Sequence, residues 1–513
     1  MGTVALRSTA GKWVMVSAIL ASAMAFIDST ALNVVLPSLQ KSLQATGADL
    51  FWILNAYLLM LASLILIGGS LGDKLGRKKV FMAGILIFIA GSAACGLSPG
   101  VTLLIVFRII QGIGGALMIP GSLSLISSSI NEQERGKAIG TWSAFTTVVT
   151  MGGPVLGGAL GDAGLWRYIF FINVPIGLAA LLMLWLKVKE SRDETRDHSL
   201  DLPGAITIAL GLASITFGFL RIPAVGLANW QVYTTLSAGV LLLIAFVINE
   251  AKSKHPMMPL QLFANATFSG ANLLSFFLYA GLGAGMLFLS LNMVQVQGYS
   301  QLQSGLTFLP FTIMMISLAR FAGTLADKYG PRLLLIIGPA AAGAGLLILS
   351  FIKQTNGPAD YWTTFFPGVI AFGLGMSFTV APLTTAVMGS VSEHFSGTAS
   401  GVNNAVTRIA NVFANAIFGA LAVLFFTGAL QHKLAEVKLK AQEKQEVLAQ
   451  AADLGNAKVP SDIQLAEKAA IGKYYHESFI TAYANIMRIS AALGFLGSLM
   501  AVIFIKNSAV KKE

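Results

Sequence analysis

The sequence predicts an all-α polytopic membrane protein with fourteen transmembrane helices, and three observations support this fold class. Of the 513 residues, 55% are hydrophobic and only 11% are charged, whereas a soluble domain carries about 25% charged residues. The apolar residues form runs of about 20, long enough to cross a hydrocarbon core of about 30 Å. Short polar stretches separate these runs. This composition excludes a soluble globular protein and a disordered chain.

The expected spans follow the apolar runs along the chain. The first run is longer than the apolar region of a signal peptide, and no soluble domain follows it, so we expect it to remain as a helix. Cys95 is the single cysteine and lies in the third run, which excludes an intrachain disulfide. The fourteen expected spans are 13–36, 51–72, 80–98, 102–126, 136–160, 167–187, 203–221, 232–249, 268–294, 303–326, 333–352, 363–388, 396–426 and 478–505.

The distribution of basic residues predicts the orientation in the membrane. If the N-terminus lies in the cytoplasm, the inner segments hold nineteen Lys and Arg, and the short outer connections hold four. Cytoplasmic loops are enriched in Lys and Arg, so we expect a plasma (inner) membrane protein with both termini in the cytoplasm. The net charge of +11 follows from this distribution. Because the basic residues are spread over many loops, the charge does not indicate nucleic-acid binding.

A long polar segment, residues 428–476, separates the last two expected spans on the outer side. It contains seven Lys and six Asp or Glu, and long loops do not follow the orientation rule. Apolar residues such as Leu434, Val437 and Leu448 recur with partial helical periodicity, which Pro460 interrupts. We therefore expect a helical hairpin, and we favour a solvated surface segment over a gate or a partner site.

Two loops share one sequence pattern and indicate an internal repeat. Residues 69–79 and 323–332 both read G-x-L-x-D-K-x-G, with Asp73 and Asp327 separated by 254 positions. A second correspondence, at an offset of 261, relates the G-x-G of Gly112 to that of Gly373 and Gly136-x-x-x-Gly140 to Gly397-x-x-x-Gly401. Repeated helical halves with a site at their interface are typical of alternating-access transporters.

The repeat divides the chain into three parts. We expect an N-terminal six-helix bundle over 1–200 and a C-terminal six-helix bundle over 256–513, which includes the outer segment. Two further transmembrane helices over 201–255 are inserted between them. The two bundles should therefore have the same internal packing.

Several motifs on successive spans identify a family. Arg108-x-x-Gln111-Gly112 lies on the fourth span, Gly153-Pro154-x-x-Gly157-Gly158 on the fifth, and Asp28-Ser29-Thr30 with Asn33 on the first. With the loop at 69–79 and the segment 166–175, these motifs resemble the major facilitator superfamily, and within it the fourteen-span drug:proton antiporters. The resemblance implies an exporter. The antiporter motif of the fifth span is matched in part, since Val149 stands where glycine is usual.

Asp28 is the one acidic residue that lies well inside a span. An ionised carboxylate there is costly, so intramembrane acids usually face a cavity and take part in function. Burial raises the pKa of a carboxyl group and an adjacent cation lowers it. Arg108 should lie at the same depth, so we expect Asp28 to carry a proton and Arg108 to modulate it. Val369 occupies the equivalent position in the second half. The alternatives are a fixed salt bridge and a hydrogen bond between helices.

Other polar and glycine residues are candidates for binding and gating. The family's fold implies that Asp73 meets the N-terminus of span 13, where the helix dipole stabilises a carboxylate. Two roles are possible for Arg408: it contacts the substrate, or it packs against backbone carbonyls. The candidate substrate contacts are Asn33, Asn55, Gln111, Asn404, Arg408 and Asn411. The candidate gate residues are Gly69, Asp73, Gly76, Arg77, Lys78, Arg320, Asp327 and Gly330. Gly153, Pro154, Gly157 and Gly158 serve either helix packing or the direction of transport.

The sequence lacks the motifs of soluble enzymes. No phosphate-binding G-x-x-x-x-G-K-[ST] and no H-E-x-x-H or paired-cysteine motif occurs, so we expect no enzyme activity, no metal and no cofactor, with the proton gradient as the energy source. The prediction is a monomeric proton-coupled antiporter that exports small amphipathic compounds through the lipid membrane, with an accessory periplasmic partner left open. The alternatives are an exporter of an anionic metabolite or lipid-like substrate, and a non-transporting receptor or scaffold.

Overall fold

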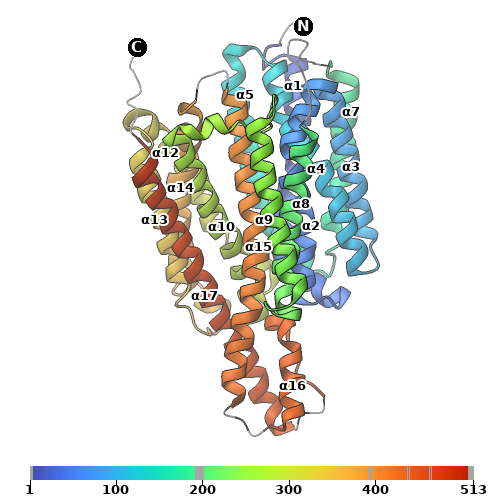
Figure 1. The fold of residues 1–513 in the computed structure, drawn as a ribbon, viewed down its shortest axis with the longest axis vertical. Coiled ribbons are helices and arrows are strands. Elements are labelled where there is room, and N and C mark those ends of the chain that lie inside the picture. The colour runs from blue at the N-terminus through green and yellow to red at the C-terminus, as the bar shows by residue number, and fades with distance from the viewer. Residues whose placement is uncertain are drawn as a thin grey trace.

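The computed structural model describes residues 4–190, 201–391, 395–435, 437, 439–461, 463 and 465–506. Its regular elements within these residues are helices, and η marks a short 3₁₀ helix (Figure 1). In chain order they are α1 (Thr9–Leu43), α2 (Gly47–Leu75), α3 (Arg77–Leu97), α4 (Val101–Ser129), α5 (Glu132–Asp162), α6 (Tyr168–Phe171), α7 (Asn173–Lys187), α8 (Leu202–Val225), α9 (Trp230–Lys252), η1 (Leu260–Ala264), α10 (Ala266–Gln295), α11 (Gln301–Leu306), α12 (Leu309–Tyr329), α13 (Arg332–Leu349), η2 (Pro358–Asp360), α14 (Phe365–Gly389), α15 (Ser396–Ala435), α16 (Ala441–Ala449), η4 (Gln450–Asn456) and α17 (Leu465–Phe504).

The helices agree with the predicted class of membrane protein. Thirteen helical segments of the described chain are long and apolar enough to cross a membrane. The fifth expected span corresponds to α5, a helix of 31 residues that is not among these thirteen. The all-helical fold is therefore confirmed, and the count of fourteen spans stays a prediction.

Glycine allows the chain to turn at both repeated loops. Gly76, between α2 and α3, has a φ of 109°, and Gly330, between α12 and α13, has a φ of 84°. Residues with a β-carbon rarely adopt these values. A β-carbon on Gly76 would also lie 2.8 Å from the carboxyl carbon of Glu190. The glycines of the repeated motif therefore have a local structural role in each half.

The same glycine contacts recur in the two halves. A β-carbon on Gly114 of α4 would lie 2.4 Å from the backbone nitrogen of Phe88 on α3, and one on Gly375 of α14 would lie 2.2 Å from that of Ala342 on α13. Phe88 and Ala342 are related by the 254-residue offset of the loop motif. The repeat seen in the sequence is thus accompanied by repeated helix packing at these glycines. We call α1–α7 the N-terminal half and α10–α15 with α17 the C-terminal half. Helices α8 and α9 pack on each other, and α8 also contacts α2 and α15.

The molecule has two distinct ends along its long axis (Figure 1). Helix α1 begins and α17 finishes at one end, which we call the terminal end. Helix α16 and η4 lie at the opposite end, which we call the hairpin end. Helices α15 and α17 have 40 residues each, which corresponds to about 60 Å, or twice the thickness of a hydrocarbon core.

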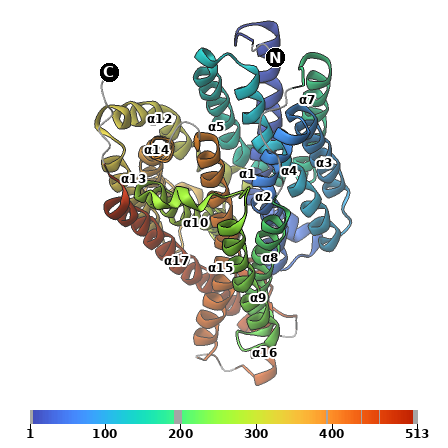
Figure 2. The ribbon, with the colours of Figure 1, turned by 45° about the horizontal axis from the view of Figure 1, so that its top comes forward.

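The segment at the hairpin end is helical, as expected, and it also contacts the ends of the spans, which the preference for a solvated surface segment did not include. Its 3₁₀ helix η4 contacts α2 of the N-terminal half and α10, α15 and α17 of the C-terminal half. Figure 2 shows the neighbouring helix α16 at this end of the molecule. The Asn456 side-chain amide donates to Gln40 at the end of α1 over 2.7 Å, and Gln295 at the end of α10 donates to the same oxygen over 3.3 Å. Leu454 of η4 is 3% exposed. Its apolar residues are therefore buried against the ends of the spans, a contact that periodicity alone could not predict.

A second set of contacts joins the halves at the hairpin end. The carboxylate of Asp162, at the end of α5, accepts hydrogen bonds from the backbone N–H groups of Gln301 and Leu302 over 2.7 and 2.9 Å. The Gln301 side chain donates to Ser38 of α1 over 2.5 Å. Helix α5 packs extensively on α11 and much less on α12, which continues toward the terminal end. The halves are therefore closed on each other at the hairpin end.

Candidate functional site

A buried charge pair lies between α1 and α4. The Nη1 atom of Arg108 donates to Oδ2 of Asp28 over 2.5 Å, and the side chains are 1% and 0% exposed. The Nε atom of Arg108 donates to the backbone carbonyl of Ile53 on α2 over 3.3 Å. The structure thus brings together the acid and the cation that the sequence placed at the same depth.

Gln111 completes this cluster. Its Nε2 donates to the second carboxylate oxygen of Asp28 over 2.9 Å, and its Oε1 accepts from Nη1 of Arg108 over 2.8 Å. Arg108 and Gln111 are three residues apart on α4, so they share one helix face. The sequence suggested Gln111 as a substrate contact, but the structure places its amide on Asp28. We call Asp28, Arg108 and Gln111 the carboxylate cluster.

Two residues that sequence reasoning missed surround this cluster. The guanidinium carbon of Arg108 lies 4.3 Å from the centre of the Tyr57 ring on α2, and the Cys95 thiol donates to Oε1 of Gln111 over 3.8 Å. Tyr57 is 0% exposed. The sequence held one signal for Tyr57. A phenylalanine, Phe311, occupies the equivalent position in the second half, so the hydroxyl group is specific to the N-terminal half.

The carboxylate cluster can exist in two electrostatic states. With Asp28 ionised, its charge is balanced by Arg108 and both of its oxygens are hydrogen-bonded. A proton on Asp28 removes the counter-ion of a buried cation, and a buried pair that loses one partner is destabilised by about 3–5 kcal/mol. Protonation therefore favours a rearrangement in which Arg108 gains water or another acceptor.

The remaining candidate substrate contacts lie on three helices. Asn55 on α2 is 0% exposed, and neither atom of its amide has a hydrogen-bond partner. Asn33 on α1 and Arg408 on α15 are part-buried. Asn404 and Asn411 donate to carbonyls of their own helix, at Ser400 and Thr407. These residues share no side-chain hydrogen bond or ion pair with one another within the described chain, and their role in binding stays a prediction.

The candidate gate residues at the terminal end are described only in part. The side chains of Asp73 and Asp327, and those at the start of α15, lie outside the described residues. The Lys78 ammonium donates to the carbonyls of Val188 and Trp185, within the N-terminal half. Arg320 on α12 is exposed. The proposed latch therefore stays untested, and the Lys78 contacts favour a structural role over a contact with the other half.

The antiporter motif of α5 lies where the two halves meet. A β-carbon on Gly157 would lie 2.3 Å from the carbonyl oxygen of Ala31 on α1, and one on Gly158 would lie 2.4 Å from that of Gln301 on α11. One on Gly153 would lie 1.9 Å from the hydroxyl of Thr30. These glycines allow α5 to approach both its own half and the C-terminal half. A substitution would thus disturb the closed hairpin end directly.

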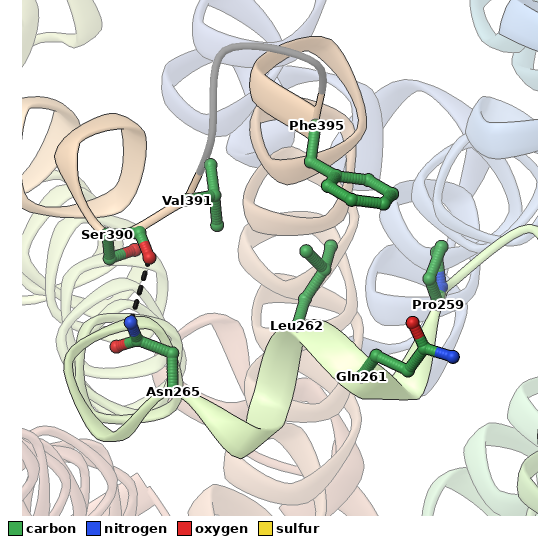
Figure 3. A pocket seen from close by; sticks show the side chains of 7 residues that line it. All are labelled: Pro259, Gln261, Leu262, Asn265, Ser390, Val391 and Phe395. Carbon is green, nitrogen blue, oxygen red and sulfur yellow. Dashed lines mark hydrogen bonds between the residues drawn. The ribbon is translucent and has the colours of Figure 1, made fainter.

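A cavity of about 200 Å³ lies at the terminal end, beside η1 and the end of α14 (Figure 3). Asn265 donates to the Ser390 carbonyl at its edge over 2.8 Å, and no charged residue lines it within the described chain. No cluster of three or more His, Cys, Asp or Glu side chains suited to a metal occurs among the described residues. The carboxylate cluster therefore remains the candidate functional site.

Comparisons with known proteins agree with this architecture. Residues 18–415 match the model of the Major Facilitator Superfamily. The chain is 29% identical to the tetracenomycin C resistance and export protein of Streptomyces glaucescens over 93% of this chain and 89% of that protein. It is 30% identical to the multidrug resistance protein Stp of Mycobacterium tuberculosis, over 80% of this chain and 76% of that protein.

A solved structure has the same fold. The crystal structure of a bacterial homologue of the human lysosomal transporter Spinster, in an inward-facing and unoccupied conformation, aligns with a TM-score of 0.67. The alignment has 19% identity and covers 96% of this chain and 98% of that one. With the family match over most of its length and relatives named for drug resistance, the chain is a multi-pass membrane transporter that belongs to the major facilitator superfamily, and it is not an enzyme.

Proposed function

We propose that the protein is a proton-coupled antiporter that exports small amphipathic compounds by alternating access. The observation that carries this proposal is the carboxylate cluster, because an acid buried among membrane spans is costly and usually serves a substrate or ion pathway. The names of the tetracenomycin C and multidrug resistance relatives support export of small molecules. A receptor or scaffold would need neither a buried acid nor paired loops in two repeated halves.

In this mechanism Asp28 carries the proton and Arg108 controls its release. When the hairpin end opens, water reaches Asp28 and a proton binds, which frees Arg108 from its counter-ion. When the hairpin end closes and the terminal end opens, Arg108 returns to Asp28 and the proton leaves. We assign the described structure, in which Asp28 is paired with Arg108 and the hairpin end is closed, to the state after proton release.

The proposed orientation places the terminal end in the cytoplasm. Basic residues are concentrated in the loops on that side, as the positive-inside rule requires. The protein would then lie in the plasma (inner) membrane as a monomer that uses the proton gradient without a cofactor.

We also propose a stoichiometry of one proton per cycle, because one acid is placed to carry it. An inward charge yields about 2.3 kcal/mol per 100 mV, and one pH unit yields about 1.36 kcal/mol. Together these terms support about a 500-fold gradient of a neutral substrate. A monovalent cation that leaves as the proton enters cancels the voltage term, which leaves about tenfold per pH unit.

Transport by purified protein in proteoliposomes tests this proposal. An imposed pH gradient is combined with a panel of cationic, neutral and anionic compounds, and the potential is clamped with potassium and valinomycin. We expect accumulation that requires the pH gradient. Transport of the same compounds at equal rates without any proton gradient would contradict proton coupling.

A further inference from the structure

The intramembrane arginines differ sharply in how they are satisfied. Arg108 pairs with Asp28 and is 1% exposed. Arg408, on α15, is part-buried and makes no hydrogen bond or ion pair with any described residue. An arginine inside the spans is costly and normally pairs with an acid or with backbone carbonyls. The five N–H donors of Arg408 therefore await an acceptor that the described part of the chain does not provide.

Arg408 reaches across the interface between the two halves. Its guanidinium carbon lies 5.8 Å from the centre of the Phe26 ring on α1. Phe26 precedes Asp28 by two residues, a difference of about 3 Å along the helix axis. The unsatisfied cation is thus at the level of the carboxylate cluster, on the opposite half. In alternating-access transporters the substrate binds at this interface.

The neighbours of Arg408 are aromatic. The ring of Phe26 lies beside its guanidinium, and Tyr57 on α2 and Tyr279 on α10 are near enough to influence its charge. Tyr57 also stacks on Arg108, so it links the unsatisfied cation to the carboxylate cluster. Aromatic faces beside a guanidinium accommodate a planar organic group whose acidic substituent reaches the cation.

The charges at this level of the molecule leave one cation in excess. Asp28 is balanced by Arg108, and we find no second described carboxylate in contact with Arg408. An organic cation entering beside Arg408 would be repelled, and an organic anion would be attracted. The site is therefore selective for charge as well as for apolar character.

We propose that Arg408 binds the anionic group of the substrate, and that the exported compounds are amphipathic organic acids with an aromatic or planar body. This inference deepens the proposed function and rests on it. The anion and the proton occupy different groups, so their exchange follows from the change of conformation and not from competition for one atom. An anion that leaves while a proton enters moves two units of positive charge inward. The membrane potential therefore contributes twice the driving force that it contributes for a neutral substrate.

Three naphthalene compounds with one common ring system test the proposal. These are 2-naphthoate, the neutral 2-naphthamide and the cationic 2-naphthylmethylammonium, measured in proteoliposomes with the wild type, Arg408→Gln, Arg408→Lys and Arg488→Gln. Arg488 is the matched control because it is an exposed arginine that donates to Asn485 on its own helix. Equal amounts of folded protein are verified by size-exclusion chromatography before each measurement.

We expect Arg408→Gln to lower naphthoate transport at least tenfold, with naphthamide transport within twofold of the wild type. Arg408→Lys should retain part of the naphthoate transport, and Arg488→Gln should change neither. Each charge that moves through 100 mV changes the accumulation ratio about 50-fold. Naphthoate transport moves two charges and naphthamide transport one, so naphthoate accumulation should depend on the potential twice as steeply.

The proposal is overturned if Arg408→Gln lowers naphthamide and naphthoate transport equally, or if the wild type moves the cationic probe and not naphthoate. It is also overturned if the wild type moves none of the three probes while it transports other compounds of the wider panel. Arg408-dependent naphthoate transport that ignores the proton gradient would contradict the proposed proton coupling and leave the anion site intact. The failures of the two proposals are therefore distinguishable.

Discussion

The two halves of the molecule pack through the same glycines and bury different chemistry between their helices. In the N-terminal half, Tyr57 lies on Arg108, which pairs with Asp28. The equivalent residues of the C-terminal half are Phe311 and Val369, related by the 254- and 261-residue offsets. Val369 is 2% exposed. The same helix packing is therefore built once around charges and once around apolar side chains.

Gln111 also has an apolar equivalent in the C-terminal half. Its equivalent, Phe372, stacks on Phe311 with ring centres 5.3 Å apart and an angle of 21° between the planes. Aromatic stacking of this kind stabilises a core without any polar group. Because the fold forms without a charged cluster in one half, the cluster in the other half is not required for packing. This comparison is our main reason to assign the cluster to transport.

The largest expected effect comes from removing the acid that distinguishes the N-terminal half. Asp28→Asn should reduce proton-driven transport by about 100-fold or more, the usual range for loss of an essential proton-transfer group. The amide can still accept and donate hydrogen bonds within the cluster, but Arg108 loses its counter-ion, so transport is compared at equal amounts of folded protein. The measurement is pH-driven uptake into inverted vesicles, and an active Asn variant would refute the assignment of Asp28.

The next largest effect concerns Arg108 and Val369, which occupy equivalent positions in the two halves. Arg108→Ala should lower coupled transport by roughly 20-fold or more, because it leaves the buried Asp28 unpaired. Val369→Ala should stay within about twofold, since it removes two methyl groups from an apolar contact and affects stability more than transport. Both variants are measured in the same vesicle assay. Equal losses of transport in the two variants would indicate that Arg108 serves helix packing and not proton coupling.

The contacts at the hairpin end predict that transport requires the halves to separate there. Cysteines at Gln40 and Asn456, on a Cys95→Ser background, are joined by a short thiol-reactive cross-linker, since the side chains meet at 2.7 Å. Transport should fall about tenfold and recover when the cross-link is cleaved, because alternating access needs this end to open. Each single-cysteine variant is the control. Full activity of the cross-linked protein would show that η4 does not move with the gate.

The repeated loops predict a smaller and unequal effect at the terminal end. Asp73→Asn and Asp327→Asn should both shift the balance toward a hairpin-end-closed state by a few-fold, with Asp73 giving the larger shift. Three basic residues follow Gly76, so the first loop matches its motif more fully than the second. Cysteine labelling from the outer face, without Cys95, measures this balance. Unchanged labelling in both variants would refute the latch.

The smallest expected effect concerns Asp453 of η4, outside the spans. Burial raises the pKa of this carboxyl group, the charge of Asp49 raises it further, and Lys458 opposes both. A raised folded-state pKa means that the folded protein prefers protonated Asp453. This stabilisation is therefore present at low pH and lost as the pH rises through the raised pKa. Asp453→Asn should raise the unfolding temperature on the order of 1–2 °C at pH 7.

The comparison with the wild type at low pH tests the sign of this effect. The carboxyl group gains a proton as the pH falls and then resembles the amide, so the unfolding temperatures of the two proteins should converge toward low pH. Thermal unfolding in detergent between pH 4 and 8 measures the difference. A stabilisation that is equal at all pH values would assign it to hydrogen bonding and not to charge.

Much of this architecture was predictable from the sequence. Apolar runs of membrane length predicted the helices, and the offsets of 254 and 261 predicted the repeated packing of α4 and α14. The Asp28–Arg108 pair followed from depth alone, since both residues lie at similar distances from the outer ends of their spans. The depth of a residue in the membrane can be estimated from the sequence because the helix rise per residue is constant.

Rotation about the helix axes and distant contacts were harder to predict. Whether Gln111 faces Asp28 or a substrate depends on how α4 is rotated about its axis. A helix that is apolar on all sides has no amphipathic pattern that would specify this rotation. The contacts of Asn456 with Gln40 and of Asp162 with Gln301 join residues 416 and 139 positions apart. No local pattern encodes such pairs, so the sequence favoured a solvated surface segment where the structure has a contact between halves.

The most direct test of the central claim is to observe the proton on Asp28. Infrared difference spectra of the reconstituted protein, recorded as the pH is lowered, contain the C=O band of each carboxyl group that gains a proton. Among these bands, we expect one that is present in the wild type, absent from Asp28→Asn and shifted in Arg108→Ala, where the counter-ion is lost. Identical difference spectra for the wild type and Asp28→Asn would contradict the claim that Asp28 carries the transported proton.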